Sequence, residues 1–120
     1  MSNAAQAYAR ASQSVSSPRE IEAQALLKAA RKLQDAADLG ASLATIEDAL
    51  VFNRKLWSIF VTEAMSADNP QPVETRQGLA NLGIFVLSQS AALQVMPEVD
   101  KIMSLVEINR NVAAGLSGRA

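Results

Sequence analysis

Helix breakers divide this chain of 120 residues into long segments, and their spacing constrains the fold more than any other feature. The breakers are Ser17-Pro18, Gly40, the stretch at residues 70–72 and Pro97. The apolar residues of the segments between them recur at helical spacing, and much of the apolar content is alanine, which favours helix interiors. The sequence therefore predicts long helices at about residues 17–39, 42–66, 72–94 and 97–116.

The first break carries the clearest local signal. Ser17 can cap a helix that has Pro18 at its first position, and Glu20 can reach back to the cap, which forms a capping box. A short helix at about residues 3–14 is expected before it, within an N-terminal part at residues 1–16 that docks or frays. The predicted fold class is therefore all-α. It is a single helical bundle of four long helices plus a short N-terminal helix, and residues 1–120 form one domain.

Composition argues against catalysis. The chain has no cysteine and no histidine, so it lacks thiolate ligands, disulfides and the commonest general base near neutral pH. It also has no phosphate-binding glycine loop, no dinucleotide-binding turn and no zinc-protease motif. We expect no catalytic, cofactor-binding or metal-binding residues, and no enzyme activity.

Charge and hydropathy bear on possible partners. The net charge is −1 and the longest basic runs are pairs, Arg31-Lys32 and Arg54-Lys55, so no direct nucleic-acid contact is expected. The strongest apolar run, residues 79–87, is too short to span a bilayer and predicts a central, buried helix instead. The N-terminus does not resemble a signal peptide, and a cytoplasmic location is expected.

Two of the predicted helices share an Asn-Arg pair in similar surroundings. Asn53 and Asn109 each lie in the middle of an apolar arc, with Arg54 and Arg110 at the edges. One interpretation is that each asparagine is buried and satisfied within the protein, since an unpaired buried amide costs about 1–3 kcal/mol. The other is that the Asn-Arg pairs anchor a partner helix. Trp57, the only tryptophan, is more typical of a core residue than of a binding hot spot.

The apolar arc of the helix at residues 42–66 spans roughly 200°, whereas a surface helix needs only about 100° to face a core. The part of the apolar arc that does not face the core must be covered by a third layer within the protein, by a second copy of the chain or by a partner. The candidate partner-binding residues are Phe52, Arg54, Leu56, Trp57 and Arg110. The candidate structural polar residues are Ser17, Glu20, Asn53 and Asn109.

Three strings together resemble a known family. They are Ser17-Pro18-Arg19-Glu20, then Phe52-Asn53-Arg54-Lys55-Leu56-Trp57, then Ile108-Asn109-Arg110-Asn111-Val112-Ala113-Ala114-Gly115-Leu116. The sequence resembles FlaF, the flagellar biosynthesis regulators of alphaproteobacteria, over residues 8–116. The resemblance implies a protein that promotes flagellin production and export and opposes the translational repressor FlbT.

The resemblance also implies partners. Flagellin is the expected client, bound in a chaperone-like manner, with FlbT or flagellar export components as further partners and a homo-oligomer as an option. Two alternatives remain open at this stage. One is an RNA-linked post-transcriptional regulator, and the other is a structural partner of FlbT that does not bind flagellin directly.

Overall fold

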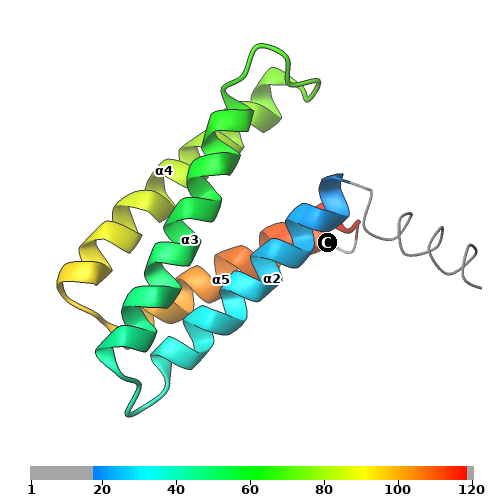
Figure 1. Ribbon diagram of the computed structural model, residues 1–120. Helices are drawn as coiled ribbons and strands as arrows, with labels where there is room; N and C mark the ends of the chain where they lie inside the picture. The colour runs from blue at the N-terminus through cyan, green and yellow to red at the C-terminus, as the bar shows by residue number, and fades with distance from the viewer. Residues whose placement is uncertain (1–17, 119–120) are drawn as a thin grey trace, which may run out of the picture.

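The computed structural model describes residues 18–118, and these residues form an all-helical protein with no strand among them (Figure 1). The helices are α2 (Pro18–Ala37), α3 (Leu43–Ala64), α4 (Val73–Val95) and α5 (Val99–Leu116). The all-α prediction is confirmed, and each helix lies where the breakers predicted it to within a turn. The expected short N-terminal helix and the capping residue Ser17 fall outside the described residues.

Local chemistry explains where α3 begins. The Ser42 hydroxyl caps α3 by accepting a hydrogen bond from the backbone N–H of Thr45 at 3.1 Å. Gly40 adopts a φ of 88° in the turn after α2, a left-handed conformation that glycine adopts without steric cost. The glycine and the cap together end one helix and start the next within a few residues.

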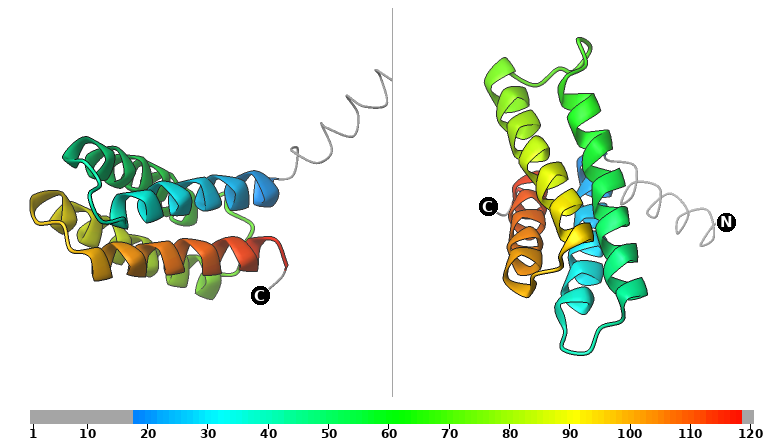
Figure 2. Two further views of the ribbon diagram at one scale, coloured as in Figure 1. Left: turned by 90° about the horizontal axis from the view of Figure 1, so that it is seen from below. Right: turned by 90° about the vertical axis from the view of Figure 1, so that its left-hand side faces the viewer.

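The helices form two pairs. The pairs are α2 with α5 and α3 with α4, and α2 packs against α3 to join them. The pairs meet near the α2–α3 and α4–α5 turns and diverge toward the α3–α4 loop (Figures 1 and 2). Because of this divergence α4 and α5 touch only slightly, although they are consecutive in the chain.

The core lies where the two pairs cross, and Trp57 is its largest fully buried side chain. The Phe60 ring packs edge-to-face against Trp57, with ring centroids 5.4 Å apart. Around them pack fully buried aliphatic side chains from all four helices: Leu26, Leu33, Leu50, Val86, Leu93, Ile102, Leu105 and Val106. The apolar residues that recur along the four helices thus pack together into one shared core.

A glycine sets the close packing of α3 on α4. A Cβ atom added at Gly83 would lie 2.3 Å from Val61 Cγ2 and 3.4 Å from Trp57 Cε3. Such a contact is far inside van der Waals distance, so only glycine fits here unless the Val61 side chain or α3 moves. The sequence of α4 therefore contains a position that selects the register of this helix pair.

The position of α4 corrects one expectation. The apolar run at residues 79–87 predicted a central, buried helix, but α4 lies at the periphery and is covered mainly by α3. Its exposed large apolar side chains are Val73, Ile84, Phe85 and Val95. Because apolar residues lie all round α4, several of its sides could be buried. In the fold, however, another helix covers mainly one side.

By length and composition alone α4 could also cross a membrane. Its most apolar window has a hydropathy of 1.3, and 28% of that window is buried inside the protein. Core helices of soluble proteins share this length and composition, so these two properties alone do not define a membrane span. The low buried share of this stretch shows that the other helices leave much of the apolar surface of α4 uncovered.

Candidate interaction surface

The two asparagines form a hydrogen-bond relay with the tryptophan in the core. Trp57 Nε1 donates to Asn109 Oδ1 at 3.0 Å, and Asn109 Nδ2 donates to Asn53 Oδ1 at 2.7 Å. All three side chains are fully buried. The relay joins α3 to α5 across the crossing of the helix pairs. The prediction that both asparagines are buried and hydrogen-bonded within the protein is confirmed.

One amide nitrogen of the relay has no hydrogen-bond partner of its own. Asn53 Nδ2 has no hydrogen-bond partner among the described residues, and neither does the buried hydroxyl of Ser90 on α4. The sequence analysis did not single out Ser90, because one serine in an apolar run gives no pattern. Two polar groups, one in α3 and one in α4, therefore remain buried without a hydrogen-bond partner among the described residues.

Both arginines of the Asn-Arg pairs connect helices. Arg54 Nη1 donates to Gln94 Oε1 at 2.9 Å, which links α3 to α4, and Gln94 Nε2 donates in turn to Glu47 Oε1 at 3.0 Å. Arg110 donates to Gln34 Oε1 and so links α5 to α2. Gln94 and Gln34 were not predicted, because a single glutamine in a helix carries no sequence signal for such a role.

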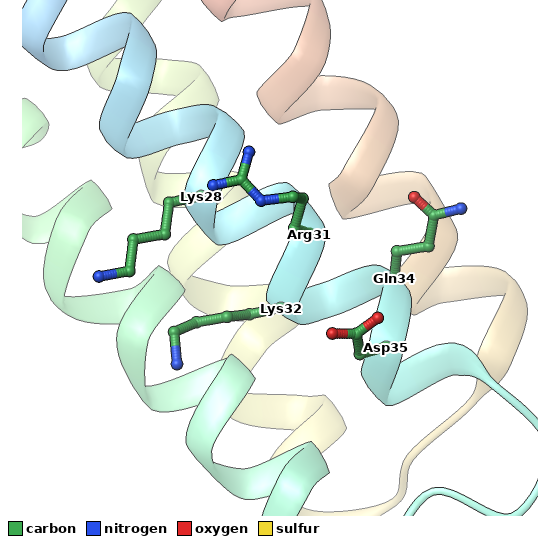
Figure 3. A pocket seen from close by; sticks show the side chains of 5 residues that line it. All are labelled: Lys28, Arg31, Lys32, Gln34 and Asp35. Carbon is green, nitrogen blue, oxygen red and sulfur yellow. The ribbon is translucent and has the colours of Figure 1, made fainter.

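Phe52 lies under two lysines of α2. The Nζ atoms of Lys28 and Lys32 lie 5.4 and 5.3 Å from the centre of its ring, and Lys32 also forms an ion pair with Asp48 at 2.8 Å. The hydrogen bond from Lys32 lowers the pKa of Asp48. The lysines extend from α2 toward α3 in Figure 3, beside a shallow hollow that Arg31, Gln34 and Asp35 also line.

The candidate partner-binding residues thus lie within or beside helix contacts. Trp57 is fully buried, Leu56 packs half-buried against the core, and Phe52 is half-buried beneath the lysines. Glu20 is half-buried in the first turn of α2. Partner binding by Phe52, Arg54, Leu56, Trp57 and Arg110 stays a prediction, and together they do not form a continuous exposed surface.

A continuous exposed surface lies instead on α4. We define the α4 outer face by seven exposed residues: Gln77, Asn81, Ile84, Phe85, Ser88, Ala92 and Val95. The chain has no charged residue from residue 77 to residue 97. An exposed helix face without any charge is unusual, because water-facing helix surfaces are normally rich in charged side chains. Sequence reasoning missed this face because the run was assigned to the core.

A groove adjoins the α4 outer face where α3 ends. The groove, of about 370 Å³, is lined by Ala64, Met65, Val73, Arg76, Gln77, Ala80, Asn81 and Ile84, and we call it the α3–α4 groove. Arg76 is its one charged residue. The guanidinium group donates to the backbone oxygens of Gln71 at 3.2 Å and Ser66 at 3.3 Å. The charge is therefore held against the α3–α4 loop, and the rest of the groove is uncharged.

Two carboxylates meet between α2 and α3. Partial burial, the hydrogen bond with Glu63 and the negative charge of Glu63 together raise the pKa of Glu22 to about 7, while the charge of Arg19 acts in the opposite direction. The Glu22 carboxyl group therefore keeps its proton to a higher pH than an isolated carboxyl group does. Within residues 18–118, no cluster of acidic side chains could hold a metal ion.

These features define a small all-α protein of two crossed helix pairs, with an internal polar relay and an uncharged apolar face. The model of the family described as flagellar protein FlaF matches residues 4–116, and the chain belongs to this family. No curated protein and no solved structure matches the chain.

Proposed function

We propose that this protein promotes flagellin production and export by binding flagellin in the cytoplasm as a chaperone-like factor, and that it opposes FlbT. One observation supports the proposal above all others. This chain belongs to a flagellar protein family, and its α4 exposes an uncharged surface that carries large apolar side chains. Large exposed apolar surfaces usually mark interaction sites. The function proposed is binding, not catalysis.

The proposal fits the physical problem that a flagellin monomer presents. Its terminal segments pack as helices in the filament and expose apolar side chains before assembly. A small helical protein can cover such a segment by packing against its apolar face. Ordering the segment on binding reduces the net affinity, which suits a client that must be released for export.

Two of the four cationic side chains on α2 are engaged within the protein. Lys28 and Lys32 both pack over the ring of Phe52, and Lys32 is also paired with Asp48. These side chains are engaged within the protein, whereas RNA binding requires cations directed at phosphates. These two lysines therefore give the RNA-linked alternative little support.

The test is binding by the full-length purified protein. We expect a complex with monomeric flagellin by size-exclusion chromatography and calorimetry, and no shift of flagellin leader RNA in a gel at moderate salt. FlbT is assayed in parallel. Binding to FlbT without binding to flagellin would replace the chaperone proposal with a role as a structural partner of FlbT. A salt-sensitive RNA shift would favour the RNA-linked alternative.

A further inference from the structure

We infer that the α3–α4 groove and the α4 outer face together dock one amphipathic helix of a partner protein, through an uncharged apolar stripe on that helix. The inference rests on the proposed function, namely that the protein acts by binding another protein. It goes further because it places the site and states the chemistry of the docking segment.

The charge pattern specifies the chemistry of the partner. No charged residue occurs at positions 77–97, and Arg76 at the edge is held by two backbone oxygens. A charged side chain of a partner would lose hydration against this surface and gain no ion pair in return. The segment that fits must therefore present apolar and neutral polar side chains, complementary to Ile84 and Phe85 and to the amides of Gln77 and Asn81.

The shape of the surface fits a helix. Small residues separate the large ones, with Gly78, Ala91 and Ala92 exposed along α4. No atom lies within 4 Å of a Cβ built at Gly78, so the backbone is open to close approach there. At 1.5 Å per residue the uncharged part of α4 is about 28 Å long, which matches a partner helix of about five turns.

The size of the surface favours a single helix over a second copy of the chain. The strip is about 28 Å by about 10 Å in projection, the width of one helix. A stable dimer usually uses about 20–30 residues on each partner, whereas the α4 outer face and the α3–α4 groove together comprise twelve residues. A docking segment that is one helix wide matches the strip, and its modest contact area fits a complex that must come apart.

The chain offers a matched pair of variants for the test. Ile84 is 57% exposed on the α4 outer face, and Ile21 is 51% exposed on α2. Ile84→Asp and Ile21→Asp therefore make the same chemical change at similar exposure on different surfaces. Phe85→Asp gives a second change on the α4 outer face. Circular dichroism melts of all variants identify any that fail to fold.

Two labelled probes are titrated with each full-length variant by fluorescence anisotropy. One is monomeric flagellin, and the other is a synthetic helical peptide of five turns with an uncharged Leu/Ala stripe. We expect Ile84→Asp and Phe85→Asp to weaken binding about tenfold or more, as loss of a central apolar anchor does, and Ile21→Asp to bind like the wild type.

The outcomes separate this inference from the proposed function. If only the peptide binds, and binding depends on Ile84, the docking site stands and flagellin is not its client. If flagellin binds equally to all variants, the client stands and the docking site is overturned. The site is also overturned if neither probe binds the wild type. It is overturned as well if Ile84→Asp dissolves a dimer in sedimentation, or abolishes binding to phosphatidylglycerol vesicles, because another occupant then covers the face.

Discussion

Trp57 and Asn109 are joined by a buried hydrogen bond of 3.0 Å, in which the indole Nε1 donates to the amide oxygen Oδ1. The indole N–H can only donate, so it fixes which side of the Asn109 amide faces it. The amide nitrogen of Asn109 must then point to Asn53 Oδ1, as observed. One tryptophan thus sets the direction of the whole relay between α3 and α5.

The relay is expected to behave as one unit in mutagenesis. Asn109→Ala leaves the Trp57 N–H and Asn53 Oδ1 unpaired and should lower the free energy of unfolding by about 2–4 kcal/mol. Trp57→Phe should cost about 1–3 kcal/mol. Because both changes break the same contact, the double variant should cost less than the sum of the two. Urea denaturation followed by circular dichroism measures all three, and strict additivity would contradict the relay.

Gly83→Ala should destabilise the protein by about 1–3 kcal/mol, although alanine is the better helix former. The new methyl group would meet Val61 Cγ2 at 2.3 Å, and the β-branched valine has little rotamer freedom in a helix. Val61→Ala in the same chain should recover part of the loss. Gly78→Ala is the matched control in α4 and should stabilise by about 0.5–1 kcal/mol, because that position is open. Thermal melts of the four proteins distinguish packing from helix propensity.

Stability should fall as the pH rises through the range from about 4.5 to about 7. The pKa of Glu22 is raised from 4.5 to about 7 in the folded protein, mainly by burial and then by Glu63. In that range the folded state binds more protons than the unfolded state, so raising the pH favours unfolding. The stability that the protonated Glu22 carboxyl group contributes is fully present below pH 4.5 and is lost above about pH 7.

Glu22→Gln should remove this dependence and raise the melting temperature at pH 8. The neutral amide does not repel the Glu63 carboxylate, and it can donate a hydrogen bond to it. We expect a gain of no more than about 1 kcal/mol, because the site is only partly buried and solvent screens the charges. Glu107→Gln, on the exposed side of α5, changes the net charge equally and serves as the control. Parallel pH profiles for wild type and Glu22→Gln would show that this carboxyl group does not titrate as described.

Arg54→Ala should cost about 0.5–1.5 kcal/mol, because it removes the hydrogen bond to Gln94 that ties α3 to α4. Lys55→Ala, at the exposed neighbouring position, should change stability by less than about 0.5 kcal/mol. Chemical denaturation of both variants measures the difference. Equal effects would mean that the Arg54–Gln94 contact contributes nothing to the pairing of these helices.

Local signals predicted the helices well because each one acts within a few residues. Ser42, Gly40 and the prolines mark the helix ends through backbone chemistry that does not depend on the rest of the fold. The burial of Asn53 and Asn109 could also be predicted, since it follows from their position on the apolar arcs. What these signals do not contain is which helix packs against which.

The candidate surface could not be predicted for the same reason. An all-round apolar segment such as residues 79–87 has no preferred side, so its sequence does not reveal how many neighbours cover it. The pairing of α3 with α4 depends on Gly83 meeting Val61, a contact between residues distant in the chain. The surface of α4 became visible only once the fold showed that α5 diverges from it.

The slight contact between α4 and α5 has a consequence for amide hydrogen exchange. Because α4 is held mainly by α3 and only slightly by α5, separating it from the protein breaks one large helix contact, whereas releasing α2 breaks two. Local opening free energies scale with the packing that each segment must give up. The backbone amides of α4 should therefore exchange with deuterium sooner than those of α2, and a ligand on the α4 outer face should slow them most. Deuterium exchange of the α4 amides thus reports directly whether a ligand occupies the α4 outer face.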